Sequence, residues 1–395
     1  MLKKNVLPII LLVAFGFQAA KAITDPMIIK WWFNTTNNKY NGILTDVEAV
    51  YYTATDVYVK TSGVPNYYMD GVTHNNAKDL KATWDIPRNP SAASSPTGPQ
   101  GGQHGLMLDG SVSFTAGDAQ SYNGAGVWNR LAYYFEGMDM DAANGHSTPT
   151  NMYHHHFDNL KLHGWDSSVH SPIVGYAWDG YPIYGPFGYK NTNGTGGITR
   201  MKTSYQTKTY TTRTNGPAVS TTYPIGCFIE DWQYTASSGD LDDHNGRFCV
   251  TPEYPSGTYA YFTTVDASLK PIYPYFIGPT LYGSYTNANV GPSGGSSTIP
   301  GSAVQYTPPT TVKEVEAMDN NVTLFPVPVK DVLNIQFKDS KNYEITIYDA
   351  EGKVLQNTKT TTNTQIDMSA YSYGMYFVGV ANSNGSGFIK RVVKM

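Results

Sequence analysis

The chain has 395 residues, of which 27 are basic and 31 acidic, giving a formal net charge of −4. This mildly acidic balance, without basic clusters, argues against nucleic acid or anionic membranes as partners. The 31 tyrosines, 38 glycines and 24 prolines favour strands joined by turns, because aromatic side chains suit half-buried pleated surfaces. We therefore expect a mainly β protein without long helices.

Residues 1–22 have the form of a secretory signal peptide. Lys3 and Lys4 are followed by a short apolar run at 6–17, and Ala20-Lys21-Ala22 provides small residues for a cleavage site. The apolar run is too short for a comfortable transmembrane helix, and no later stretch reaches that length. We expect export through the inner membrane, removal of this segment and no transmembrane span in the mature protein.

The chain has two cysteines, Cys227 and Cys249. In an exported protein a pair of cysteines is more often a disulfide than two free thiols, so we expect Cys227 and Cys249 to be bonded. Closing a loop of this length should stabilise the fold by about 3 kcal/mol, mainly because it restricts the unfolded chain.

A change in composition divides the exported chain into parts. Residues 285–320 are rich in Gly, Ser, Thr and Pro and poor in apolar residues, which is typical of a linker. They separate a β-rich segment at 23–284, long enough to bury one sizeable core, from a tail at 321–395. Short alternating runs between turns in the tail favour a small Ig-like β-sandwich.

The tail contains a set of short motifs, namely Leu324-Phe325-Pro326-Val327-Pro328, Ile347-Tyr348-Asp349 with Gly352-Lys353, Ile366-Asp367-Met368, Gly374-Met375-Tyr376-Phe377 and a terminal basic and apolar run. With these motifs the tail resembles the type IX secretion C-terminal sorting domain of Bacteroidetes-type bacteria. Val327 departs from the pattern, since the family usually has Asn between the two prolines. The resemblance implies recognition by the type IX secretion machinery, followed by release or attachment at the outer-membrane surface.

Two segments of the main part repeat one pattern. Residues 105–114 and 175–184 both contain Gly-x-x-x-Asp-Gly, with an apolar residue just before the Asp. An apolar strand that runs into an Asp-Gly turn and out into another strand predicts a β-hairpin. The repetition raises the hypothesis of an internal duplication.

Three consecutive histidines, His154 to His156, lie in a stretch whose aromatic neighbours favour a strand. Side chains alternate along a strand, so His154 and His156 share one face and His155 points to the other. Two imidazoles on one face can begin a Zn or Cu site, to which His146 could add a third. Further candidate ligands are His163, His170, Asp179, Asp243 and His244.

Other interpretations remain open from the residues alone. Paired histidines can also be structural groups that hold neighbouring carbonyls, and His74 and His104 are expected to be surface or packing residues. Glu136 and Glu253 stand in motif-rich contexts where an acid could act as a general base, and Asp179 is a further candidate.

Several motifs surround the three histidines, namely Gly145-His146, His170-Ser171-Pro172 with Gly175, Asp179-Gly180 with Pro182-Ile183-Tyr184-Gly185, Asn245-Gly246-Arg247, Thr251-Pro252-Glu253 and Gly257-Thr258-Tyr259-Ala260-Tyr261. With Tyr153-His154-His155-His156, these blocks resemble the YHYH protein family across about residues 100–280. The family's Tyr-His-x-His signature falls on residues 153–156, with His155 where the family usually has Tyr. The resemblance implies a shared fold and site, but no reaction.

These observations lead to one main hypothesis and one alternative. In the first, a secreted or cell-surface protein binds one divalent transition metal, Cu or Zn, through His154, His156 and His146, and His170, Asp179 or Glu253 completes or orients the shell. An open coordination position would suit a metal-dependent extracellular enzyme, and a closed one would suit metal capture or stability. In the alternative, the histidines are structural and the protein binds a small molecule, a polysaccharide or extracellular matrix.

Overall fold

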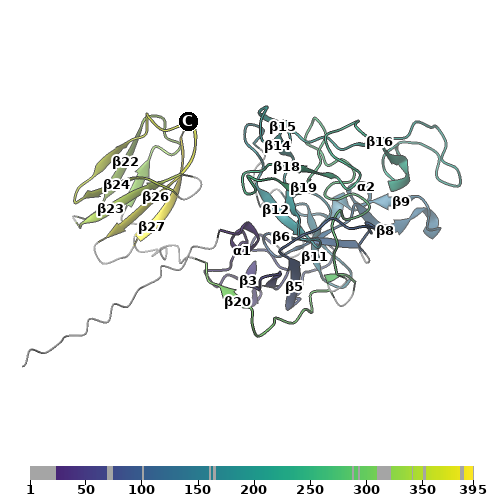
Figure 1. Cartoon of the computed structure of the whole chain (residues 1–395), viewed down its shortest axis with the longest axis horizontal. Helices are drawn as coiled ribbons and strands as arrows, with labels where there is room; N and C mark the ends of the chain where they lie inside the picture. The colour runs from purple at the N-terminus through teal and green to yellow at the C-terminus, as the bar shows by residue number, and fades with distance from the viewer. Residues whose placement is uncertain are drawn as a thin grey trace, which may run out of the picture. The chain divides into compact units, whose positions relative to one another are not determined.

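The computed structural model describes residues 24–68, 74–99, 102–159, 162, 166–286, 289–291, 294–308, 322–339, 341–349, 353–382 and 387–394. The chain divides into two compact units, Met1–Tyr306 and Thr307–Met395, and each is described by itself (Figure 1). The expected signal peptide lies outside the described residues. As the composition predicts, the described chain is mainly β, and its α-helices, α1 and α2, have four residues each.

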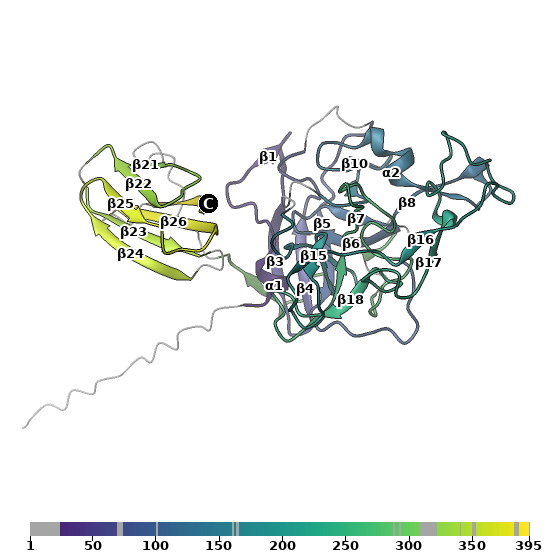
Figure 2. The same cartoon turned by 90° about the horizontal axis from the view of Figure 1, so that it is seen from above.

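An eight-stranded sheet forms the centre of the first unit (Figure 2). Its strands follow one another in space as β10 (Gly145–Ser147), β11 (Tyr153–His155), β7 (Val112–Phe114), β6 (Gln103–Met107), β12 (Ile173–Ala177), β13 (Pro182–Tyr184), β19 (Thr258–Phe262) and β18 (Gly246–Cys249).

The two halves of this sheet have the same construction. Each half begins at the middle with a hairpin, β6–β7 or β12–β13, so both hairpins expected from the repeated pattern are present. The outer strand of each hairpin then pairs in parallel with β11 or β19, and the last strand, β10 or β18, is antiparallel. The sheet is therefore a duplicated unit with its midpoint between β6 and β12.

Residue pairing shows that the duplication extends to individual positions. At the midpoint Gly105 pairs with Ala177, and Gly175 pairs with Met107, as a two-fold relation requires. At the two edges His146 pairs with His154, and Arg247 pairs with Ala260. His154 and Ala260 therefore occupy corresponding positions in the two halves.

A second sheet contributes to the same hydrophobic core. It contains β20 (Val304–Tyr306), β3 (Val47–Tyr52), β4 (Asp56–Thr61) and β5 (Ala82–Pro87). Trp84 of β5 stacks on Trp178, which follows β12, with ring centroids 5.1 Å apart and both rings buried. Such large buried rings contribute strongly to stability through the surface that they remove from water.

Part of the segment expected to be a linker is folded into this unit. Asn289 and Val290 are buried, and the Asn289 side chain bonds the backbone of Asp85. β20 pairs with β3, so the compact unit reaches Tyr306 rather than ending at 284. The low apolar content of the segment did not predict this packing. It depends on the Asn289 side chain, on the pairing of β20 with β3, and on a few apolar side chains such as Val290. Residues 287–288, 292–293 and 309–320 of the expected linker lie outside the described residues.

Short elements surround the two sheets. They are α1 (Pro26–Ile29), α2 (Ala132–Phe135), the 3₁₀ segments Tyr122–Gly124, Gly137–Asp139 and Ile229–Asp231, and the strand pairs β1 (Lys39–Tyr40) with β2 (Ile43–Leu44), β8 (Gly117–Ser121) with β9 (Asn129–Leu131), β14 (Phe187–Tyr189) with β15 (Ile198–Arg200), and β16 (Tyr205–Thr207) with β17 (Trp232–Tyr234).

A fully buried carboxylate stands at the turn of each central hairpin. Asp109 accepts hydrogen bonds from the Tyr67 hydroxyl at 2.6 Å and the Asn159 amide at 3.0 Å. Asp179 accepts from the Tyr261 hydroxyl at 2.6 Å and the Gly283 amide at 2.8 Å. Asp179, a sequence candidate for catalysis or metal binding, is thus engaged in holding the core together.

Cys227 and Cys249 are both free, buried thiols, so the structure does not contain the expected disulfide. The Cys227 sulfur lies 3.9 Å from Nη2 of Arg213, whose guanidinium is paired with Asp231. Cys249 ends β18, opposite Thr258 of β19, within the main core. The number of cysteines and the expected export favoured a disulfide bond, but in the fold the two sulfur atoms pack against different residues.

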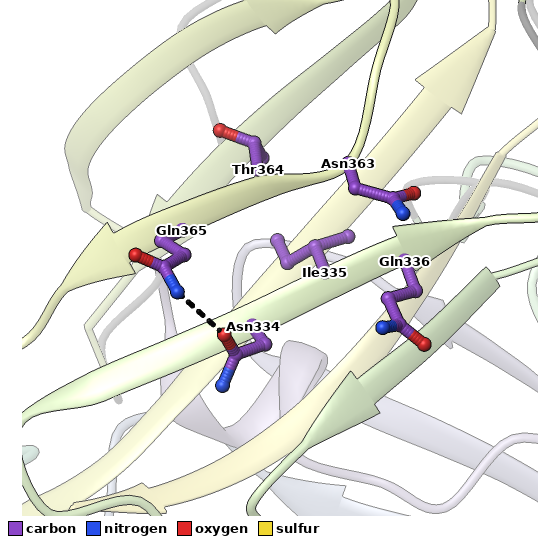
Figure 3. A pocket seen from close by; sticks show the side chains of 6 residues that line it. All are labelled: Asn334, Ile335, Gln336, Asn363, Thr364 and Gln365. Carbon is purple, nitrogen blue, oxygen red and sulfur yellow. Dashed lines mark hydrogen bonds between the residues drawn. The ribbon is translucent and has the colours of Figure 1, made fainter.

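The second unit has two antiparallel sheets around its own core. One contains β21 (Val322–Phe325), β22 (Val332–Phe337) and β25 (Thr364–Asp367), and the other β24 (Val354–Thr360), β23 (Tyr343–Tyr348), β26 (Gly374–Asn382) and β27 (Gly387–Lys394). Figure 3 shows a polar surface pocket on β22 and β25, where Gln365 donates a hydrogen bond to Asn334 at 2.9 Å. Across the described residues of both units, no helix has the length and apolar character needed to span a membrane.

We predict that Asp179→Asn lowers the free energy of unfolding by about 1–3 kcal/mol, because an amide NH₂ would face groups that donate to the carboxylate. Burial raises the pKa of Asp179 from 3.8 to about 6. A carboxyl pKa that is higher in the folded state means that this group's contribution to stability falls as the pH rises between these values. The variant should lose that part of the pH dependence in chemical denaturation. Equal effects from Asp166→Asn, at an exposed turn, would contradict the assignment.

We also predict the behaviour of the two thiols. Burial raises the pKa of Cys227 to about 12, and burial likewise raises the pKa of Cys249, so neither should react with a thiol reagent in the folded protein. Two thiols should titrate in denaturant without reductant. Finding none under those conditions would show that the exported protein forms the disulfide after all.

Candidate functional site

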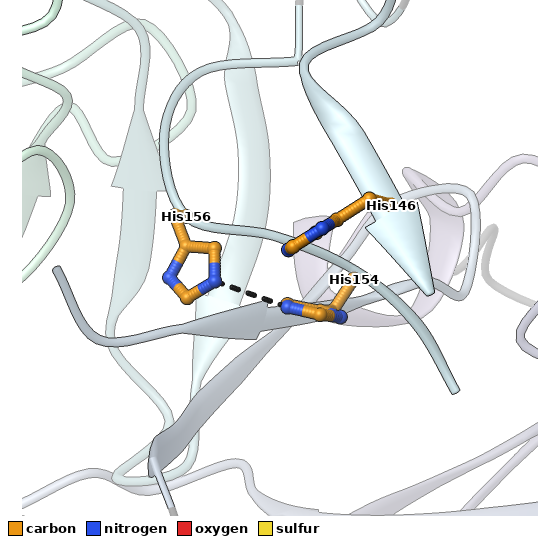
Figure 4. A group of neighbouring side chains, drawn as sticks. All are labelled: His146, His154 and His156. Atoms are coloured by element: carbon orange, nitrogen blue, oxygen red, sulfur yellow. Dashed lines mark hydrogen bonds between the residues drawn. The ribbon is translucent and has the colours of Figure 1, made fainter. Parts of the chain in front are cut away.

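Three of the histidines singled out in the sequence converge in the first half of the sheet (Figure 4). His146 in β10 and His154 in β11 are direct cross-strand neighbours, and His156 lies one residue beyond the end of β11. Strand alternation brings His154 and His156 to one side, as predicted. One potential ligand atom from each ring lies within 4.8 Å of the other two, and all three residues are buried.

Each of the three rings has a hydrogen-bond acceptor at Nδ1. Nδ1 of His146 lies 3.2 Å from Oδ2 of Asp139. Nδ1 of His154 lies 3.2 Å from the Met152 carbonyl, and Nδ1 of His156 lies 2.6 Å from the Thr115 carbonyl. A carbonyl or carboxylate oxygen can only accept, so the proton of each neutral ring belongs on Nδ1. The Nε2 atoms therefore carry lone pairs, as in metal-binding histidines whose other nitrogen is held by an outer partner.

The Nε2 atoms meet at short distances. Nε2 of His154 and Nε2 of His156 are 3.0 Å apart, drawn as the dashed line in Figure 4. Nε2 of His146 is buried and has no hydrogen-bond partner. Two lone pairs facing each other at this distance repel, so the arrangement requires a proton or a metal cation between them.

Burial favours the neutral form of two of these rings, His154 and His146. Desolvation lowers the pKa of His154 well below its ordinary value, helped by the neighbouring His156 and His146. Desolvation also lowers the pKa of His146. Phe114 covers His154, with ring centroids 4.1 Å apart. Neutral imidazole is the form that binds a metal ion, so the apolar cover and the close packing of the rings favour ligation.

A carboxylate faces the same point from another element. Glu136 directly follows α2, and its Oε2 lies 3.2 Å from Nε2 of His156 and 3.7 Å from Nε2 of His146. This oxygen is buried and accepts no hydrogen bond. From the sequence, Glu136 is expected only as a general base, because nothing in the local pattern connects it with histidines ten or more residues later.

Asp139 and His74 extend the site to the surface. The Asp139 carboxylate accepts hydrogen bonds from the backbone of His74 at 2.8 Å and from the His74 ring. His74 is largely exposed, yet through Asp139 it is connected to His146. His74 is thus a surface residue, as expected, and its contact with Asp139 was not anticipated from the sequence. His104 is a packing residue as expected: it is buried, contacts Phe276, and bonds the Ser113 hydroxyl at 3.0 Å.

The other sequence candidates that the structure describes are not part of this histidine group. His170 packs against Tyr184 and Tyr189, and its Nδ1 bonds the Ser171 carbonyl at 2.7 Å. Glu253 pairs with Lys30 at 3.0 Å and accepts from the Tyr184 hydroxyl at 3.0 Å. Proximity in the sequence suggested His170 as a ligand, but the strand order puts it in the other half of the sheet. His163 is outside the described residues.

The corresponding position in the second half contains no histidine group. The pairing register places Arg247 where His146 stands, Ala260 for His154 and Phe262 for His156. Phe262 is fully buried and stacks with Tyr184. The second half thus preserves the strand arrangement and fills the site with packing side chains.

Comparison with known structures gives weak likenesses, among them the following two. One match is a DUF3244 family protein with an immunoglobulin-like β-sandwich fold from Bacteroides vulgatus, at 17% identity over 20% of this chain and 88% of that chain, with a TM-score of 0.18. Another is PorZ, a surface component of the type IX secretion system of Porphyromonas gingivalis, at 12% identity over 89% of this chain and 59% of that chain, with a TM-score of 0.17. Neither TM-score supports a structural argument. No curated protein matches the chain.

Two family models match the chain in separate regions. Residues 83–273, which contain the duplicated sheet and all three histidines, match the model described as YHYH protein. Residues 323–395 match the secretion system C-terminal sorting domain. The chain therefore carries a YHYH domain at residues 83–273, followed by a type IX secretion C-terminal sorting domain at residues 323–395.

Proposed function

We propose that the protein is exported and that its YHYH domain binds one divalent transition-metal ion, Cu²⁺ or Zn²⁺, through Nε2 of His146, His154 and His156. The observation that carries this proposal is the orientation of the rings. Each Nδ1 has an oxygen acceptor, so three lone pairs converge on one buried point. Imidazole nitrogen is a preferred ligand of both ions.

A metal ion fits this point better than a proton does. One proton on His156 could be shared with His154 or with Glu136, but it would leave Nε2 of His146 buried without a partner. Burial of a polar nitrogen without a partner costs about 1–3 kcal/mol. A single cation at the shared point would satisfy all three rings, and it would stabilise the lone pairs that otherwise repel.

The sorting domain implies where the site operates. A type IX sorting domain directs its chain to the cell surface or the extracellular space. We propose that residues 1–22 first take the chain through the inner membrane, as their basic and apolar pattern indicates. The metal site would then face the surroundings of the cell, where it could meet ions that are not buffered by the cytoplasm.

We predict that protein purified without a histidine tag binds one Zn²⁺ or Cu²⁺ per chain, measured by elemental analysis after dialysis. The double variant His154→Ala/His156→Ala should lose this stoichiometric binding. Because an ion that binds only the folded state stabilises it, chelation should lower the Tm of the wild-type protein and leave that of the variant unchanged.

The matched control for this experiment is His170→Ala, which removes a histidine of the same domain outside the group. It should retain one ion per chain. A wild-type protein that takes up no metal and shows no change in Tm with excess Zn²⁺ or Cu²⁺ would refute the proposed function, and loss of metal in the control would refute the ligand assignment.

Asp139 should act as a positioning residue for His146. We predict that Asp139→Asn weakens metal affinity by about 10–100-fold, because a neutral amide holds the Nδ1 proton less strongly than a carboxylate does. Competition with a chromophoric chelator measures the change. Asp166→Asn, on an exposed turn, should leave the affinity unaltered, and an unaltered Asp139→Asn would show that the contact does not tune the ligand.

A further inference from the structure

Glu136 adds a carboxylate oxygen beside the three histidine nitrogens. Its Oε2 stands 3.2 Å from Nε2 of His156 and 3.7 Å from Nε2 of His146, and Nε2 of His154 is 3.0 Å from Nε2 of His156. For bonds of about 2.0–2.1 Å to a tetrahedral ion, neighbouring ligand atoms should be about 3.4 Å apart. The three distances scatter around that value. Glu136 therefore lies next to two of the three nitrogens. The ligand atoms that lie within 4.8 Å of one another are those of the histidines alone, so ligation by Glu136 requires its carboxylate to turn toward His154.

The unsatisfied atoms at the site support the same assignment. Oε2 of Glu136 and Nε2 of His146 are both buried and both lack a hydrogen-bond partner. The His146 side chain is only 6% exposed, so its free nitrogen has no route to solvent. A carboxylate oxygen is an acceptor, and so is Nε2 of an imidazole whose proton is on Nδ1. Neither atom can donate a hydrogen bond to the other. A cation between them satisfies both.

Burial also distinguishes Glu136 from the three histidines. The side chains of His146 and His156 are 6% and 3% exposed, whereas that of Glu136 is 25% exposed. His154 is buried under Phe114. Glu136 is therefore the most exposed of the four side chains, although its Oε2 is itself buried.

We propose that Glu136 is the fourth protein ligand, so that the site is a closed tetrahedral centre of three imidazole nitrogens and one carboxylate oxygen. This inference rests on the proposed metal-binding function and assigns its type. A centre with four protein ligands holds its ion without an open position for a substrate, unlike catalytic zinc sites with three protein ligands and water. The site is built to capture and retain a metal ion. Its tetrahedral arrangement suits Zn²⁺ better than Cu²⁺, which prefers square-planar surroundings.

The test uses the full exported chain with Co²⁺ as a spectroscopic substitute for Zn²⁺. Wild-type protein should show the intense visible absorption of a four-coordinate Co²⁺ centre. Glu136→Gln should bind Co²⁺ and Zn²⁺ at least tenfold more weakly and should show an altered Co²⁺ spectrum. Glu253→Gln, which changes an acid paired with Lys30 outside the site, should match the wild-type protein in both measurements.

A second measurement needs no variant and covers the case in which Glu136→Gln does not fold. Azide added to the Co²⁺-loaded wild-type protein should leave its spectrum unchanged, because no coordination position is open. An azide-dependent spectrum, or a Glu136→Gln variant with wild-type affinity and spectrum, would overturn the fourth-ligand assignment and leave the histidine site intact. Failure of the wild-type protein to bind any metal would instead overturn the proposed function itself.

Discussion

Two buried carboxylates fix the framework on which the site is built. Asp109 and Asp179 stand at equivalent turns, and each ties its hairpin to segments distant in the sequence. A buried carboxylate is costly unless its oxygens accept hydrogen bonds, so the partners must be in place when the core closes. Because Asn159 follows β11 and bonds Asp109, this constraint also helps to position the strand that carries His154.

Once the strands are in register, hydrogen bonds around the three rings orient the histidines as possible ligands. Cross-strand pairing brings His146 beside His154, and alternation brings His156 to the same side. The acceptors at Nδ1 then set which nitrogen of each ring faces inward. Two of those acceptors are backbone carbonyls, so the orientation depends on the path of the chain more than on particular side chains.

The sequence predicts those features that depend on short-range patterns. Strand alternation identified the pair His154 and His156, and the repeated Asp-Gly pattern identified both hairpins. It did not place Glu136 beside the histidines, since that contact depends on how the segment after α2 folds over the sheet. From the sequence, His170 was also expected to lie near His154 and His156. The structure puts it in the other half of the sheet. Distance along the chain says little about which half of a duplicated sheet a residue occupies.

The second half of the sheet has the same strand arrangement as the first but no histidines at the corresponding positions. Ala260 and Phe262 fill the positions of His154 and His156, and Phe262 is fully buried. The strand arrangement therefore forms and packs with no ion at this position. The first half differs, because its inward-facing imidazole nitrogens need a proton or a cation. If the proposed site took up its ion only after export, its occupancy would record the metal content of the surroundings and not that of the cytoplasm.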